Sequence, residues 1–238
     1  MLARQAMAID DLSGGRMILG VGAGWLEREH TMFGYKLGDV PMRFARLEEG
    51  LNVITKLIRS TEPVNFDGSF FQLREAHLLP HPQRITPVMV GGIGPKHTLP
   101  LVARFVDIWN CFGKAPEVFR ERSSLLDQLA LENGRHPRDI VRTVMHPVIC
   151  WRDTTERECR LAQLRREGAP FSGMSNDEIV GMLQNYLGAI LGTPENVIEQ
   201  MRAYAAAGAE EMMITWWGLD DIEGLEILAE NVTPYVNA

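Results

Sequence analysis

The sequence predicts an α/β fold in which helices cover a mainly parallel sheet, either doubly wound or closed into a barrel. Three observations predict it. Helix and strand patterns alternate along the chain with short connections. The strand patterns are short, continuously apolar runs, which are typical of strands buried on both faces. Glycine and aromatic residues gather where these strands end, and the active sites of such folds lie at that edge.

The length, charge and cysteine content of the chain already exclude several classes of protein. A chain of 238 residues fits one large α/β domain or two small ones. The net charge of -7 argues against a nucleic-acid partner, which requires a concentrated basic surface. The cysteines Cys111, Cys150 and Cys159 lack metal-type spacing, which predicts reduced thiols and no metal site. No apolar run approaches about 18 residues, so we expect a cytoplasmic protein without a membrane partner.

The chain opens with a helix pattern over residues 2–12 that is ended by Ser13, Gly14 and Gly15. Met17–Val21 then reads as a buried parallel strand, followed by alternating glycines and Trp25. Glycine at a strand end admits a ligand close to the backbone, although close packing of strand against loop explains it equally well. The next carboxylates, Glu27 and Glu29, favour a surface helix start over an acid or base.

A second helix pattern runs from Phe44 to about Arg59. It is followed by VNFDGSFFQL, whose Asp67-Gly68 pair between apolar arms indicates a hairpin outside the parallel sheet. Prolines at 80, 82 and 87 then keep the chain extended up to the next strand.

The stretch at residues 86–110 carries the clearest sign of a ligand site. Strand Val88–Val90 runs into Gly91, Gly92 and Gly94, and a helix follows. With Thr98 as N-cap, Pro100 falls in the first turn of that helix, where no hydrogen bond is lost. This leaves a loop, Gly91–His97, with free backbone N–H groups and Lys96 nearby, as a phosphate cradle requires. An ordinary tight turn beside a surface lysine is the competing interpretation.

The rest of the chain continues the alternation. Strand Asp107–Phe112 precedes helix Pro116–Asn133, and strand Asp139–Cys150 follows. On that last strand, His146 before a proline favours a structural kink over a catalytic base.

Residues 151–191 show no strand pattern and read as helical, with a break at 172–175, which suggests a lid or pocket wall. Thr193 and Pro194 then begin a helix that ends at Gly208. Strand Met212–Trp216 and a final amphipathic helix complete the chain. The aromatic residues at the predicted strand ends indicate an apolar substrate pocket formed by Phe112, Trp216 and Trp217, with Trp25.

Five core strands begin near Arg16, Pro87, Asp107, Ile140 and Glu211. Three segments, LSGGRMILGVGAGW, PVMVGGIGPKHTLPLVARFVDIWN and GTPENVIEQMRAYAAAGAEEMMI, together resemble the bacterial luciferase-like superfamily, and more closely its deazaflavin-dependent oxidoreductases. The resemblance implies an eight-stranded (β/α) TIM-type barrel, usually dimeric. Members bind FMN or the deazaflavin coenzyme F(420) and transfer hydride, some of them activating oxygen.

The resemblance also implies roles for particular residues. Those that match the loop that holds the cofactor phosphate are Gly91, Gly92, Ile93 and Gly94, and those that match the strand end lining the cofactor site are Gly22, Ala23, Gly24 and Trp25. We therefore expect a coenzyme F(420)-dependent oxidoreductase acting on a small organic substrate. Two alternatives stay open: an FMN-dependent monooxygenase, and a non-catalytic barrel that binds flavin or a partner. No catalytic acid or base is assignable from the residues present.

One departure from the family pattern concerns the start of the chain, which falls in the helix before the family's fourth strand. Residues 1–238 would then form a single, N-terminally truncated and incomplete barrel domain with residues 151–191 as an insertion. Such a piece exposes two strand edges and apolar interior side chains. We expect a partner chain, a rearranged element or further N-terminal sequence to cover them.

Overall fold

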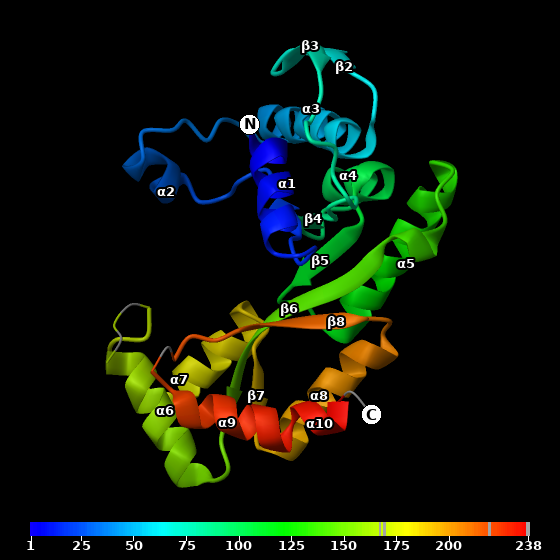
Figure 1. The fold of residues 1–238 in the computed structure, drawn as a ribbon. Coiled ribbons are helices and arrows are strands. Elements are labelled where there is room, and N and C mark those ends of the chain that lie inside the picture. Colours follow the sequence, from blue (N-terminus) through cyan, green and yellow to red (C-terminus); the bar gives the residue numbers. More distant parts are fainter. Residues whose placement is uncertain (167, 169, 219, 237–238) are drawn as a thin grey trace. The chain divides into compact units, whose positions relative to one another are not determined.

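The chain divides into two compact units, and the boundary between them falls within strand β5 (Ile108–Phe112). The computed structural model describes residues 1–166, 168, 170–218 and 220–236 (Figure 1). The first unit consists of residues 1–109 and 125–141, and the second of residues 110–124 and the chain from 142 onward.

The first unit is built around parallel strands. Strand β1 pairs with β4, Leu19 lying opposite Val88 and Val21 opposite Val90, and β5 follows β4 in the sheet. These strands and their helices confirm the predicted α/β pattern. The elements of the unit are α1 (Leu2–Leu12), β1 (Leu19–Val21), α2 (Glu27–Met32), α3 (Val40–Arg59), β2 (Val64–Asp67), β3 (Gln72–Ala76), β4 (Val88–Gly91), α4 (Thr98–Phe105), the start of β5, the end of α5 (Pro116–Glu132) and the 3-10 turn Pro137–Asp139.

A buried carboxylate connects α1 to the segments that lead into β1 and β4. Asp10 is 3% exposed; its Oδ1 accepts hydrogen bonds from the Met17 N–H at 3.0 Å and from Arg84 Nη2 at 2.7 Å. Its Oδ2 accepts one from Thr86 Oγ1 at 2.8 Å. Burial alone would raise the pKa of Asp10, but these hydrogen bonds outweigh it and lower the pKa. The network therefore fixes where both strands begin.

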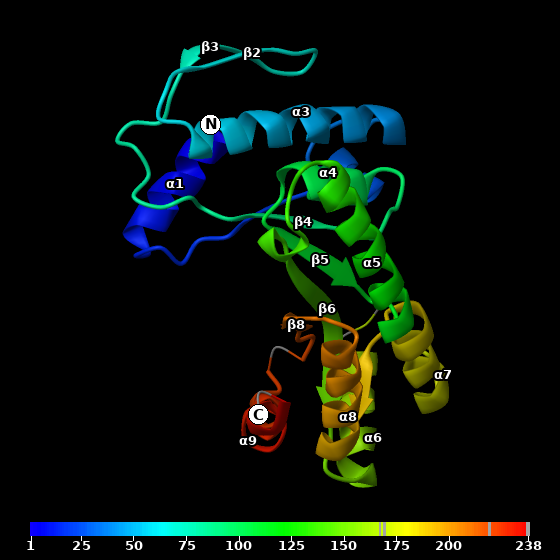
Figure 2. The same ribbon diagram turned by 90° about the vertical axis from the view of Figure 1, so that its right-hand side faces the viewer.

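The predicted hairpin is confirmed as β2–β3, which pairs antiparallel and lies alongside α3 in both views (Figures 1 and 2). One side chain of α3 holds the hairpin tip: the Glu49 carboxylate accepts hydrogen bonds from the N–H groups of Ser69, Phe70 and Phe71. Helix α3 itself is capped by Asp39, whose carboxylate accepts from the Met42 N–H at 2.8 Å.

The second unit is built around strand β6. Strand β6 pairs in parallel with β8 from Thr143 opposite Glu211 to Pro147 opposite Thr215. The elements of the unit are the end of β5, the start of α5, β6 (Val141–Cys150), α6 (Thr154–Arg166), α7 (Asn176–Gly181), the π-helical turn Met182–Tyr186, β7 (Ile190–Gly192), α8 (Pro194–Ala206), β8 (Glu211–Thr215), α9 (Ile222–Asn231) and α10 (Thr233–Val236).

Strand β7 corrects the expectation that residues 151–191 hold no strand. Its residues 190–192 are all buried and pair in parallel with Val148–Cys150 of β6. Three residues are too few to produce a strand pattern in the sequence, so the pairing with β6 decides the conformation. The helices of this segment enclose an apolar cluster with β6 and β7, formed by Ile149, Leu161, Leu164, Phe171, Ile179, Leu183, Ala189 and Leu191.

Two local predictions also need correction. Helix α4 begins at Thr98 with His97 as N-cap, one residue earlier than predicted, and Pro100 still falls in the first turn. Strand β6 continues through His146 and Pro147 without a break, because both residues keep their place in the pairing with β8. By contrast, Thr193 is the N-cap of α8 with Pro194 at the first helical position, as predicted.

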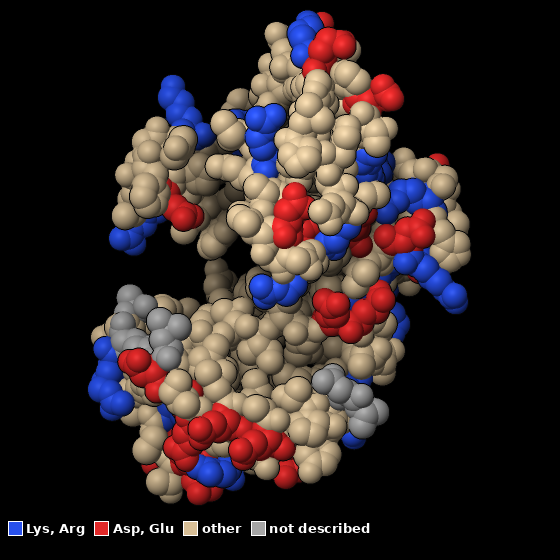
Figure 3. Space-filling model, viewed as in Figure 1, with Lys and Arg blue, Asp and Glu red and all other residues tan. Residues whose placement is uncertain are grey.

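Among the described strands, β1 in the first unit has one partner, β4, and β8 in the second unit has one partner, β6. The face shown in Figure 3 carries an acidic surface over α9, where Asp220, Asp221, Glu223, Glu226 and Glu230 fall within eleven residues. A surface of this sign repels polyanions. In the part of the chain that the structure describes, no helix is both long and apolar enough to cross a membrane.

Candidate functional site

The loop Gly91–His97 connects β4 to α4 in the first unit. Gly92 has a φ of +128°, a backbone conformation that side chains rarely adopt. A Cβ there would lie 3.2 Å from both Oγ1 and Cγ2 of Thr98, and a Cβ on Gly94 would lie 3.2 Å from the same Oγ1. The loop thus folds closely onto the first residue of α4, which leaves little room for a side chain at either glycine.

Free hydrogen-bond donors are the main chemical feature of this loop. The carbonyl of Gly94 accepts from the N–H groups of Thr98 and Leu99, each at 3.0 Å, which satisfies the start of α4 internally. Among the described residues, no hydrogen bond uses the N–H groups at positions 93, 94, 96 and 97. Several unpaired backbone donors in one tight loop at a helix start form a site suited to an anion.

A buried indole fixes the other side of the loop. Trp109 of β5 is fully buried, and its Nε1–H donates to the Gly92 carbonyl at 2.7 Å. The side chain of Lys96 is exposed on the loop, where it is available to an anionic ligand. Next to it, the His97 ring stacks on Phe44 of α3, with ring centres 5.0 Å apart.

The second predicted segment, Gly22–Trp25, follows β1. Because β1 pairs with β4 in parallel register, Gly22 follows one strand beside the point where Gly91 ends the other. Arg43 Nη1 donates to the Gly24 carbonyl at 2.6 Å, and Gly24 has a φ of +75°. Ala23 is half-buried, whereas the Trp25 side chain is 81% exposed. The structure therefore brings both predicted cofactor segments to one edge of the first unit.

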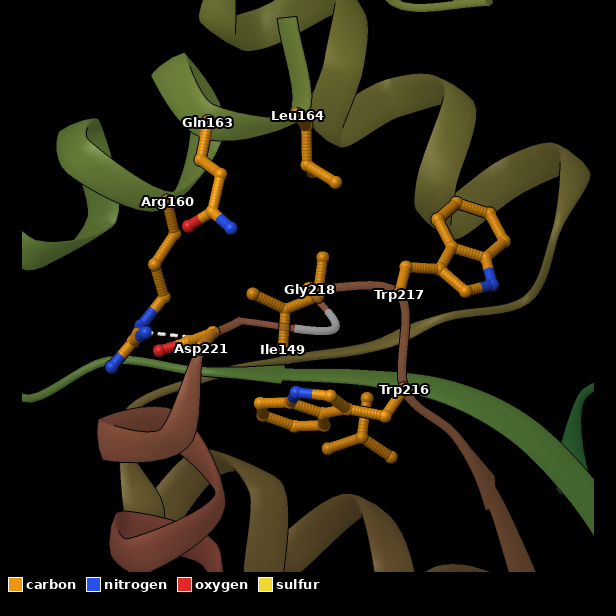
Figure 4. A pocket seen from close by; sticks show the side chains of 9 residues that line it. Ile149, Arg160, Gln163, Leu164, Trp216, Trp217, Gly218 and Asp221 are labelled. Atoms are coloured by element: carbon orange, nitrogen blue, oxygen red, sulfur yellow. Dashed lines mark hydrogen bonds and ion pairs between the residues drawn. The ribbon is translucent and has the colours of Figure 1, made fainter. Parts of the chain in front are cut away.

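In the second unit, Trp216 and Trp217 border a cavity of about 20 Å³, which holds one water-sized group (Figure 4). Arg160, 8% exposed, pairs there with Asp221. Phe112, predicted to share a pocket with the two tryptophans, is 40% exposed and is absent from this lining. The residues around the cavity are Val148, Ile149, Arg160, Gln163, Leu164, Trp216, Trp217, Gly218 and Asp221.

His146 has the surroundings of a structural residue. It is fully buried, its Nδ1–H donates to the Gly188 carbonyl at 2.6 Å, and its ring centre lies 4.4 Å from that of Tyr204. Burial lowers the pKa of His146, although the hydrogen bond to Gly188 opposes this. The ring is therefore neutral at pH 7 and is held between a carbonyl and an aromatic face.

The remaining candidate groups do not form a reactive centre. Burial raises the pKa of Cys111 to about 11 and that of Cys150 to about 11, so both thiols stay protonated at neutral pH. Glu27 and Glu29 lie in the first turn of α2 and are exposed, as expected for a surface helix start. Within the described ranges, no cluster of three or more histidines, cysteines and carboxylates could hold a metal ion.

Sequence reasoning missed Trp109 and Arg43, whose side chains hold the two loops. A tryptophan inside an apolar strand reads as core, and Trp109 is indeed fully buried. Its indole N–H nevertheless had to find a partner once buried, and a strand ending in glycines beside it was the available signal. The arginine contact joins residues 19 positions apart, which no local pattern reveals.

Comparisons with known proteins all indicate the same family for this chain. The profile described as luciferase-like monooxygenase matches residues 1–211. The chain is 25% identical over 263 residues to the pyrimidine monooxygenase RutA of Stutzerimonas stutzeri, covering 100% of this chain and 70% of that protein. It is 33% identical over 134 residues to an F(420)-dependent glucose-6-phosphate dehydrogenase of Microbacterium testaceum, covering 55% of this chain and 38% of that protein.

Solved structures show the same fold at lower identity. An F(420)-dependent secondary alcohol dehydrogenase in complex with an F(420)-acetone adduct superposes with a TM-score of 0.77 at 20% identity. That match covers 99% of this chain and 74% of the dehydrogenase. A long-chain alkane monooxygenase matches with a TM-score of 0.77 at 18% identity, over 99% of this chain and 65% of the monooxygenase. Both kinds of oxidoreductase therefore share the fold of this chain.

Proposed function

Because the chain belongs to the luciferase-like monooxygenase family, we propose that it is an oxidoreductase that binds a deazaflavin or flavin phosphate on the Gly91–His97 loop. The loop's unpaired backbone N–H groups carry this proposal. They meet the first requirement of a phosphate, which is a set of donors with no other partner. The charge of Lys96 and the small size of Gly92 and Gly94 meet the second, which is close approach to a counter-charge.

The favoured cofactor is coenzyme F(420), and the favoured reaction is hydride transfer with a small organic substrate. The cofactor supplies the hydride chemistry, whereas the protein supplies binding, orientation and exclusion of water. In this chain the loop anchors the cofactor's phosphate, and the segment Gly22–Trp25 at the neighbouring strand end approaches it across a bare backbone.

An FMN-dependent monooxygenase is the second candidate. The pyrimidine monooxygenase relative aligns with 100% of this chain, and another F(420)-dependent glucose-6-phosphate dehydrogenase, from Amycolatopsis mediterranei, aligns with 95%. Both cofactors carry a phosphate that the loop would hold, so the loop does not distinguish between them. Relatives of both types are therefore compatible with one mode of phosphate binding, in which only the ring of the cofactor differs.

We further propose that residues 151–191 wall the substrate pocket of a single catalytic domain. The Phe171 ring of this segment lies 5.7 Å from that of Trp217, which follows β8. The segment therefore packs against the C-terminal end of a core strand, where such folds place their substrates. Self-association to a homodimer belongs to the same proposal, and sedimentation of the purified chain tests it.

A paired titration tests the cofactor assignment. The purified chain is titrated with F(420) and with FMN, and fluorescence reports binding. We expect saturable binding of F(420) that is about tenfold tighter than that of FMN. Tighter binding of FMN would instead establish the monooxygenase-type cofactor. A chain that binds neither would exclude both candidates and leave a non-catalytic barrel.

A further inference from the structure

We propose that Trp109 is a positioning residue that aims the loop Gly91–His97 at the cofactor phosphate by holding the Gly92–Ile93 peptide in one orientation. The inference rests on the proposed function and adds a specific cause for the loop's geometry. Trp109 lies on β5, not on the loop, and reaches it through one hydrogen bond of 2.7 Å from Nε1 to the Gly92 carbonyl.

The orientation follows from the planarity of the peptide group. In a trans peptide, a carbonyl and the N–H of the following residue point in opposite directions. The indole that binds the Gly92 carbonyl therefore turns the N–H of Ile93 away from the buried strand. No hydrogen bond among the described residues uses that N–H group. The contact thus presents a free donor on the opposite side of the peptide.

A glycine loop needs this restraint. Gly92 at a φ of +128° has access to more backbone conformations than any other residue type, so an untethered loop would lose more entropy when it closes on a ligand. Trp109 restrains the Gly92 carbonyl, and the N–H groups of Thr98 and Leu99 restrain the Gly94 carbonyl. With both carbonyls bound, the intervening donors are ordered before the ligand arrives.

Tryptophan suits this role chemically. Its ring nitrogen only donates, so it binds a carbonyl and leaves the N–H groups of the loop free for an anion. The side chain is fully buried in the first unit, so water does not compete for the bond. A buried indole N–H is also costly to leave unpaired, which keeps the loop carbonyl engaged.

The test compares cofactors with and without a phosphate. Trp109→Phe keeps an aromatic ring on β5 and removes the N–H donor. Affinities of the wild type and the variant are measured for FMN and riboflavin, and for F(420) and its phosphate-free deazaflavin chromophore. We expect the variant to bind the phosphate-bearing member of each pair about tenfold more weakly, with affinity for the phosphate-free member unchanged.

A matched control separates this role from simple packing. Tyr204→Phe likewise keeps an aromatic ring and removes a buried donor in the second unit, the hydroxyl that donates to the Lys114 carbonyl at 2.8 Å, and should leave both affinities unchanged. An equal loss of affinity for both members of a pair, or no loss for either, would overturn the positioning role. If the wild type itself binds FMN and riboflavin equally, and likewise F(420) and its chromophore, the phosphate loop fails, and with it the proposed function.

A measurement on the wild type covers the case in which Trp109→Phe does not fold. With ¹⁵N-labelled indoles, hydrogen exchange of the Trp109 ring N–H is followed by NMR. We expect slow exchange that slows further when FMN or F(420) is added, but not when the phosphate-free form is added. An exchange rate that responds identically to both forms would overturn the inference.

Discussion

The two glycine-rich segments at the ends of β1 and β4 differ in how their backbones are held. In the Gly91–His97 loop the carbonyls of Gly92 and Gly94 both accept hydrogen bonds, and two glycines crowd Thr98. Among the described residues, one hydrogen bond holds the backbone of Gly22–Trp25; Arg43 donates it to the Gly24 carbonyl, and it is exposed. A Cβ on Gly22 would meet nothing within 4 Å.

The comparison shows that glycine content alone does not identify a ligand loop. Both segments look alike in the sequence, since each places several glycines at the end of a buried strand. What distinguishes the Gly91–His97 loop is that two of its carbonyls are held, that of Gly92 by the Trp109 indole and that of Gly94 by the start of α4. The N–H groups between these two carbonyls are therefore free and fixed in orientation. The Gly22–Trp25 segment offers a bare approach to the backbone without an ordered set of donors.

The largest expected effect comes from replacing a glycine by valine in the Gly91–His97 loop, and the same replacement in Gly22–Trp25 serves as the comparison. Gly92→Val places a branched side chain at a φ of +128° and against Thr98, a strain of about 1–3 kcal/mol that moves the loop. We expect the phosphate-bearing cofactor to bind about 100-fold more weakly, while the fold persists with a modestly lower melting temperature. Fluorescence titration and a thermal melt measure the two quantities.

Gly22→Val is the matched variant, because its side chain enters open space. Because its side chain narrows the approach to the cofactor without straining the backbone, it should weaken binding by about tenfold, well short of the loss in the Gly92 variant. Equal losses in the two variants would remove the distinction between the segments. Unchanged affinity for the Gly92 variant would remove the phosphate-loop assignment.

The second prediction concerns the support beneath both segments, the Asp10 network that positions the starts of β1 and β4. Asp10→Asn removes the charge that pairs with Arg84 and turns one acceptor into a donor facing the hydroxyl of Thr86 or the N–H of Met17. We expect a loss of about 2 kcal/mol in the free energy of unfolding, measured by denaturant titration. Asp11→Asn, at an exposed position on the same helix, is the control and should stay within about 0.5 kcal/mol of the wild type.

The same network predicts a dependence of stability on pH. The pKa of Asp10 is lower in the folded protein than in the unfolded chain, so its contribution is complete above the unfolded value of about 4. That contribution is lost as pH falls through the lower, folded pKa. The wild type should therefore lose more stability than Asp10→Asn between about pH 5 and pH 2. Parallel curves for the two proteins would show that Asp10 does not carry this dependence.

More of the fold than of the candidate site could be predicted from the sequence. Strands β1 and β4 were predictable because each lies in a short, continuous apolar run, and the start of α8 because Thr193 and Pro194 form a local capping signal. Strand β7 was not, because its three residues depend on pairing with β6. The Gly91–His97 loop was visible as glycines, but the direction of its donors was not. That direction depends on Trp109, 17 residues further along the chain from Gly92.

The smallest expected effect comes from removing the positive charge of Lys96 in the Gly91–His97 loop. Lys96 is exposed, so water and salt screen its attraction for a phosphate, and its side chain loses entropy on binding. Lys96→Ala should weaken binding of the phosphate-bearing cofactor by about fivefold at low salt, and by less as salt is raised. Lys56→Ala, which removes an exposed charge of α3 outside the loop, should have no effect. A loss as large as that of Gly92→Val would mean that a point charge, and not the ordered backbone donors, dominates phosphate binding.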